Sequence, residues 1–166
     1  ILLGTYSSIY VAKNIVLWLG VKRNWDKDDP ETQEGRKKRT KSPFEGAEEV
    51  YLAVPSQSLR ENLRIVAELV PSDAILVSLM KGVERGTLAR MSQVIREELQ
   101  VGADRVAVIS GPNLALEIAK QQPTAAVVSS ESLETATSVA ITARNEYFRS
   151  FVNTDVIGTE FGGVLK

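Results

Sequence analysis

Apolar residues gather in short blocks along the chain, and two of these blocks are apolar at nearly every position. They are the segments 74–79 (AILVSL) and 105–110 (RVAVIS). Continuous runs of this kind are typical of parallel strands that are buried on both faces of a sheet. The segment 49–54 (EVYLAV) is a similar run, and Pro55 ends it. We therefore expect three neighbouring buried strands in the middle of the chain.

Other segments show the spacing of a helix. Residues 56–70 and 87–100 place apolar side chains three and four positions apart, which predicts two helices with one buried face each. The predicted faces consist of Leu59, Leu63, Val66 and Val70 in the first helix, and of Leu88, Met91, Ile95 and Leu99 in the second.

Strands and helices alternate through the rest of the chain. The predicted strands are 1–4, 15–18, 49–54, 74–79, 105–110, 124–128 and 147–152, and the predicted helices are 5–14, 56–70, 87–100, 113–120, 132–142 and 153–166. Such alternation predicts an α/β fold, a mostly parallel sheet with helices on both faces. We expect residues 1–166 to form one domain. The last helix shows no stop signal before Lys166, so we expect the natural protein to continue.

The amino-acid composition excludes several kinds of binding and catalytic site. The 166 residues carry a net charge of -1, so no general attraction to nucleic acid is expected. The chain has no Cys and no His, which leaves no metal site of the usual kind and assigns proton transfer to Lys, Asp, Glu or Tyr. No apolar run is long enough for a membrane span. We expect a cytoplasmic protein, and we interpret the basic cluster at 36–41 as a solvated surface rather than a phosphate site.

Polar residues follow two of the buried strands. Lys81 comes after 74–79, and Gly111-Pro112-Asn113 comes after 105–110. Ligands of open parallel sheets bind beyond the carboxyl ends of the strands. We expect Pro55, Lys81 and Gly111 to line one crevice there. Taken singly, Lys81 is more readily interpreted as an exposed loop lysine than as a ligand contact, and Asn113 could equally be a plain helix cap.

One expected motif is absent. A dinucleotide-binding fold usually carries G-x-G-x-x-G after its first strand, and this chain has Gly4-Thr-Tyr-Ser-Ser there instead.

Several long motifs nevertheless carry a family resemblance. From about residue 47 to 166 the chain resembles the N-terminal, Rossmann-like cofactor-binding domain of bacterial NAD(P)-dependent glycerol-3-phosphate dehydrogenase. The motifs are AVPSQSLRENL (53–63), MKGVERGT (80–87), MSQVIREEL (91–99), VAVISGPNLALEIA (106–119), PTAAVV (123–128) and FVNTDVIGTEFGGVLK (151–166).

The resemblance implies reversible hydride transfer between sn-glycerol 3-phosphate and dihydroxyacetone phosphate, for glycerophospholipid synthesis. It makes Lys166 the catalytic proton acceptor, with Lys81 contacting both cofactor and substrate. Gly111 and Asn113 match substrate-contacting residues, although the family has Ser or Thr where this chain has Asn113. An ordinary lysine has a pKa of about 10.4, and Lys81 close to Lys166 would favour the neutral base.

The resemblance also implies NAD or NADP as cofactor, with contacts at Gly4, Pro55, Lys81 and Ala115. The family's helical second domain is absent from these 166 residues. Two alternatives therefore stay open: a non-catalytic nucleotide-binding or dimerising module, and a related two-domain hydroxy-acid dehydrogenase. The preference between NAD and NADP and the oligomeric state, for which a homodimer is one option, stay open as well.

Overall fold

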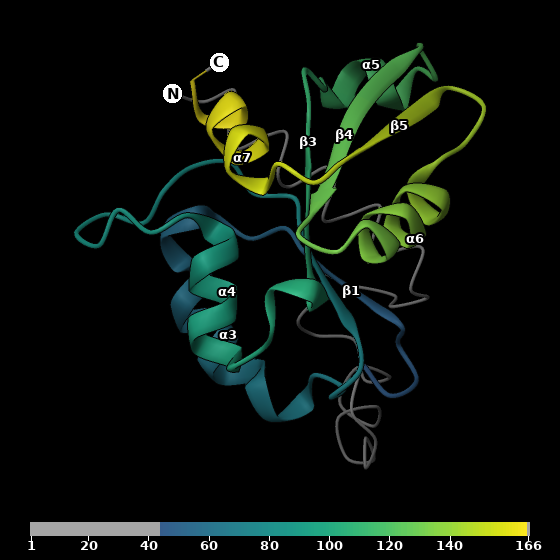
Figure 1. Ribbon diagram of the computed structural model, residues 1–166. Coiled ribbons are helices and arrows are strands. Elements are labelled where there is room, and N and C mark those ends of the chain that lie inside the picture. The colour runs from purple at the N-terminus through teal and green to yellow at the C-terminus, as the bar shows by residue number, and fades with distance from the viewer. Residues whose placement is uncertain (1–43, 166) are drawn as a thin grey trace, which may run out of the picture.

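The structure, a computed structural model, describes residues 44–165 as a five-stranded sheet with helices packed on both of its faces (Figure 1). The strands are β1 (Glu49–Leu52), β2 (Ile75–Ser78), β3 (Val106–Ser110), β4 (Thr124–Ser130) and β5 (Phe148–Asn153). The α-helices are α3 (Leu59–Val66), α4 (Met91–Leu99), α5 (Ala115–Ala119), α6 (Leu133–Ala143) and α7 (Val156–Val164). Three short 3-10 helices are η1 (Ser56–Ser58), η2 (Ala67–Leu69) and η3 (Ala103–Arg105).

These five strands confirm the corresponding sequence predictions, with ends that agree to within two residues. The predicted strands 1–4 and 15–18, the predicted helix 5–14 and the basic cluster 36–41 lie outside the described residues.

The sheet has the order β1-β2-β3-β4-β5 and is mostly parallel. β1, β2 and β3 are parallel to one another, and β5 is parallel to β4, but β4 runs antiparallel to β3. The link between β3 and β4 contains only the five-residue helix α5. Such a helix spans about 7.5 Å, less than half the roughly 16 Å length of the strand β3. It therefore does not return the chain to the end of the sheet at which β3 begins. β4 therefore begins beside the end of β3.

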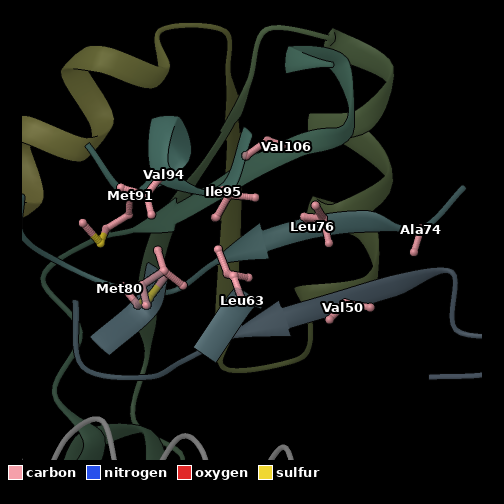
Figure 2. Close-up of a cluster of buried hydrophobic side chains, with 10 residues drawn as sticks. Val50, Leu63, Ala74, Leu76, Met80, Met91, Val94, Ile95 and Val106 are labelled. Atoms are coloured by element: carbon pink, nitrogen blue, oxygen red, sulfur yellow. The ribbon is translucent and has the colours of Figure 1, made fainter. Parts of the chain in front are cut away.

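Alternating side chains along the strands build two cores. Val50, Leu76 and Val106 are register partners on one face, where α3 and α4 cover them. Figure 2 shows Met91, Val94 and Ile95 of α4 pointing at this face. On the other face α6 packs through Val139 and Ala140, which belong to a second buried cluster, and Figure 1 shows α6 across the sheet from α3 and α4. The other members of that cluster are Val77, Ala107, Ile109, Ala126 and Val128.

Three helix predictions need correction. The segment predicted as one helix at 56–70 is α-helical only in α3, with the 3-10 helices η1 and η2 on either side of it. The helix predicted at 87–100 begins only at Met91, and Leu88 is 75% exposed with a φ of 58° instead of lying on the buried face. The backbone around Leu88 instead forms a turn in which the Leu88 N–H donates to the Glu84 carbonyl. The helix predicted at 113–120 begins at Ala115, with Leu114 as its N-cap, so Asn113 is not a helix cap.

Candidate functional site

Lys81 links the ends of two neighbouring strands. The β-ladder continues past β2, because the Leu79 N–H donates to the Leu52 carbonyl. Met80 is buried, and the chain then turns out at Lys81. The Lys81 Nζ donates a hydrogen bond of 2.8 Å to the Gly111 carbonyl, which lies one residue beyond β3. Lys81 and Gly111 therefore meet at the carboxyl edge of the parallel strands, as the sequence predicts.

Gly111 lies where no side chain fits. A Cβ built on it would stand 2.7 Å from the Ala125 carbonyl oxygen and 3.0 Å from the Ala126 Cα, both in the backbone of β4. This close approach follows from the antiparallel entry of β4 beside β3. The same Cβ position is 3.2 Å from the Asn113 Nδ2, so the Asn113 side chain lies over Gly111.

Asn113 presents an unused polar atom at this edge. Its Oδ1 is buried and has no hydrogen-bond partner among the residues that the structure describes. Buried carbonyl oxygens of this kind usually find a partner. Ala115 follows two residues later as the first residue of α5, at the same junction of loop and helix. The junction therefore offers an amide acceptor beside the Gly111 cradle.

The loop after β1 completes the edge. Pro55 precedes η1, and the Ser58 N–H donates to its carbonyl. The Gln57 side chain binds the backbone of the Lys81 loop twice: its Nε2 donates to the Val83 carbonyl at 2.8 Å, and its Oε1 accepts from the Arg85 N–H at 3.0 Å.

Glycine is again required between these two loops. Gly82 has a φ of +130°, and a Cβ there would stand 2.9 Å from the Ser56 Oγ. The loop of Pro55 and the loop of Lys81 are therefore in direct contact.

A charged network fixes the far side of the same loop. Arg60 of α3 binds Glu84 through its Nε at 2.7 Å and through a second guanidinium nitrogen at 2.9 Å, and it also pairs with Glu97 and Glu98 of α4. The hydrogen bonds from Arg60 and then from Thr87 lower the pKa of Glu84 to about 2. The hydrogen bonds to Glu84, Glu97 and Glu98 in turn raise the pKa of Arg60.

Helix α7 lies far from Lys81 in the sequence but packs beside it in the fold. A Cβ on Gly163 would stand 2.5 Å from the Ser110 Oγ and 3.6 Å from the Lys81 Cγ. Earlier in the helix, the buried Glu160 pairs with Arg90. The sequence predictions did not include Glu160, although it is the one acidic residue in an otherwise apolar and small-residue helix. That contrast is the signal that could have identified it.

Two predicted site residues, Gly4 and Lys166, lie outside the described residues. Of the others, the structure brings Lys81, Gly111 and Asn113 together and holds the Pro55 loop against the Lys81 loop. Within residues 44–165 no group of three or more acidic residues is arranged to hold a metal ion. No helix in this part of the chain is long and apolar enough to cross a membrane.

Residues 36–136, more than half of the chain, match the protein family described as NAD-dependent glycerol-3-phosphate dehydrogenase N-terminus. The chain belongs to this family. The resemblance stated from the motifs is thereby confirmed. The matched residues include β1, β2 and β3, at whose carboxyl ends Lys81 and Gly111 lie.

Relatives agree with this membership. The chain is 61% identical over 121 residues to the NAD(P)+ glycerol-3-phosphate dehydrogenase of Leifsonia xyli. The matched region covers 73% of this chain and 33% of that protein. It is 51% identical over 123 residues to the enzyme of the same name from Corynebacterium glutamicum strain R, covering 74% and 37%. The chain thus spans about a third of the length of these relatives.

A solved structure shows the same fold. The crystal structure of glycerol-3-phosphate dehydrogenase from Coxiella burnetii superposes with a TM-score of 0.66 at 29% identity, over 75% of this chain and 38% of that one. The Rossmann-like fold predicted from the sequence is therefore confirmed.

Proposed function

We propose that this chain is the cofactor-binding part of an NAD(P)-dependent glycerol-3-phosphate dehydrogenase. The whole protein would interconvert sn-glycerol 3-phosphate and dihydroxyacetone phosphate and so serve glycerophospholipid synthesis. Residues 1–166 would form the binding domain, and a helical substrate domain would follow. Family membership and the names of the relatives support this reaction. The observation that carries it within the chain is the Lys81–Gly111 contact beside the unused Asn113 Oδ1.

The residues at the carboxyl edge fit a nicotinamide cofactor and a small phosphorylated substrate. When bound, NAD or NADP supplies the hydride acceptor or donor. Lys81 brings a cation to the strand ends, where it can bind a polar oxygen of a ligand. The Asn113 Oδ1 can accept a hydrogen bond from a hydroxyl or an amide. Gly111 allows its backbone to lie against β4, because a larger residue would collide with the Ala125 carbonyl oxygen, and its own carbonyl holds the Lys81 Nζ at this edge.

Each residue then has a defined role in the proposal. Lys81 orients both reactants, and Gly111 and Asn113 contact the substrate. Lys166 takes the proton from the substrate hydroxyl during oxidation. Cofactor contacts come from Gly4, Pro55, Lys81 and Ala115, as the family resemblance implies for all four residues. Holding two reactants in line is the main contribution that these groups make to the rate.

The test is an NADH fluorescence titration of the 166-residue chain and two variants. Lys81→Met removes the cation at the strand ends, and Lys120→Met makes the same change at the exposed end of α5. We expect the chain to bind NADH, Lys81→Met to weaken binding about tenfold, and Lys120→Met to bind like the parent.

Equal binding by all three proteins would contradict the role of Lys81. No binding by the parent would reject the cofactor-binding reading of this chain. A cytoplasmic location and a homodimer stay predictions, which cell fractionation and light scattering test.

A further inference from the structure

Glu160 is a buried carboxylate that joins two distant parts of the chain. It lies in α7 with only 7% of its surface exposed. One carboxylate oxygen accepts from the Ser92 N–H at 2.9 Å, and the other accepts from the Ser92 Oγ at 2.7 Å and from Arg90 at 2.6 Å. Both partners lie at the start of α4. Glu160 therefore ties α7 to the first turn of α4.

The surroundings of Glu160 explain why a charge is tolerated there. The first N–H groups of a helix have no acceptor within the helix, and the N-terminal end carries a partial positive charge. Glu160 supplies an acceptor from another element, and the Arg90 side chain, 15% exposed, supplies the opposite charge. Because buried charges need such partners, the contact holds α7 in one position.

That position matters for Lys81 in two ways. Arg90 closes the loop that begins at Lys81, so Glu160 binds the far end of this loop. Three residues after Glu160, on the same face of α7, Gly163 lies against Ser110 and the aliphatic stem of Lys81. The α7 backbone thus forms a wall beside the Lys81 side chain.

We propose that Glu160 is a positioning residue for Lys81: by fixing α7 on the first turn of α4, it keeps Gly163 against the Lys81 stem and the Lys81 Nζ on the Gly111 carbonyl. The importance of Lys81 for cofactor binding rests on the proposed function, whereas the positioning itself does not. A helix cap with a purely structural role would change stability without acting through Lys81.

The first measurement follows the Lys81 side chain by NMR in the 166-residue chain labelled with 13C-lysine. The Lys81 signal is assigned as the one that is missing from the spectrum of Lys81→Arg. Glu160→Gln keeps the shape and removes the charge. Glu131→Gln is the matched control, because Glu131 pairs with Arg96 of α4, the helix that Glu160 also binds, but does so at an exposed site. We expect Glu160→Gln to shift the Lys81 signal, because the hydrogen bond from the Lys81 Nζ to the Gly111 carbonyl is weakened, and Glu131→Gln to leave the signal in place.

A second pair of variants avoids the charge altogether. Gly163→Ala places a Cβ 2.5 Å from the Ser110 Oγ and is expected to displace the Lys81 signal. Adding Ser110→Ala removes that oxygen, after which the nearest atom to the new methyl group is the Lys81 Cγ at 3.6 Å, an ordinary van der Waals distance. We expect the double variant to restore the parent signal. This pair keeps the proposal testable if Glu160→Gln does not fold.

NADH titration supplies the readout that a structural role would not move. We expect Glu160→Gln to weaken NADH binding about threefold to tenfold, and the double variant Glu160→Gln/Lys81→Met to bind no more weakly than Lys81→Met alone, since residues acting as one unit are not additive. Additive losses, or an unmoved Lys81 signal in folded Glu160→Gln and Gly163→Ala, would overturn the proposal. A parent chain that does not bind NADH would reject the proposed function, and the NMR result would still decide the positioning role.

Discussion

Replacing Gly111 by alanine tests the close approach on which the site is built. The new methyl group would stand 2.7 Å from the Ala125 carbonyl oxygen and 3.0 Å from the Ala126 Cα. Both are backbone atoms of β4, which is paired with β3 on one side and β5 on the other. A flexible side chain could rotate away from the methyl group, but here relief requires a strand to move.

The structure sets the size of the effect. Overfilling a packed site costs about 1–3 kcal/mol, and we expect the upper end because backbone must shift. A loss of about 3 kcal/mol is a large part of the 5–15 kcal/mol by which typical domains are stable. At about 2–4 °C for each kcal/mol in a domain of this size, the Tm should fall by roughly 6–12 °C. Lys81 should also lose its hold on the Gly111 carbonyl.

Gly162→Ala is the matched control, because it makes the same chemical change at a different kind of site. A Cβ on Gly162 meets nothing within 4 Å in the described structure, and the residue lies inside helix α7. Alanine favours a helix over glycine by about 1 kcal/mol. The control should therefore raise the Tm by about 2–4 °C.

Thermal unfolding followed by circular dichroism, together with urea titration, measures both variants against the parent chain. The two substitutions should shift the Tm in opposite directions at an unchanged urea m-value. If Gly111→Ala melts within about 2 °C of the parent, β4 does not press on Gly111 as described. If Gly162→Ala destabilises as much as Gly111→Ala, then the loss reflects glycine replacement in general and the packing argument is wrong.

Two further predictions concern acid and activity. Because Arg60 and Thr87 lower the pKa of Glu84 from 4.5 to about 2, Glu84 stabilises the fold above pH 4.5, and this stabilisation is lost as the pH falls towards 2. Arg60→Met should flatten that part of the stability profile in urea titrations, and an unaltered profile speaks against the Arg60–Glu84 pair as its source. The 166-residue chain alone should not turn over glycerol 3-phosphate, since alignment of the reactants supplies up to about 7–11 kcal/mol of the barrier and depends on the implied helical domain. Joining that domain should restore NADH-linked turnover and Lys166→Ala should abolish it, whereas full activity of the short chain would show that the substrate site is misplaced.

The sequence predicted the strands well because a strand that is buried on both faces needs apolar residues at nearly every position, and such a run is visible within a few residues. The runs AILVSL and RVAVIS contain almost no polar residue, and the structure places β2 and β3 within them. It also predicted the meeting of Lys81 and Gly111, because the ends of adjacent parallel strands share one edge of a sheet. The family motifs then indicated the reaction, which no spacing of residues showed by itself.

Helix starts were predicted less well. Leu88 has the right spacing for the buried face of α4, yet it lies in a turn that precedes the helix. Spacing reports which residues would share a face if the helix existed, and it does not report where the loop contacts end. Here the hydrogen bonds of Gln57 and the Arg60–Glu84 pair hold the loop in another conformation.

For residues 44–165, the sequence by itself therefore predicted which segments are strands, which loops carry polar groups, and which family the motifs resemble. Only the tertiary structure decided that β4 runs against β3, that its backbone requires glycine at position 111, and that Glu160 reaches Arg90 and Ser92. Burial and turn preferences act over a few neighbouring residues, so a single sequence displays them. Strand direction and the partner of a buried charge depend on contacts between residues as far apart as 90 and 160, which are fixed only when the whole sheet packs.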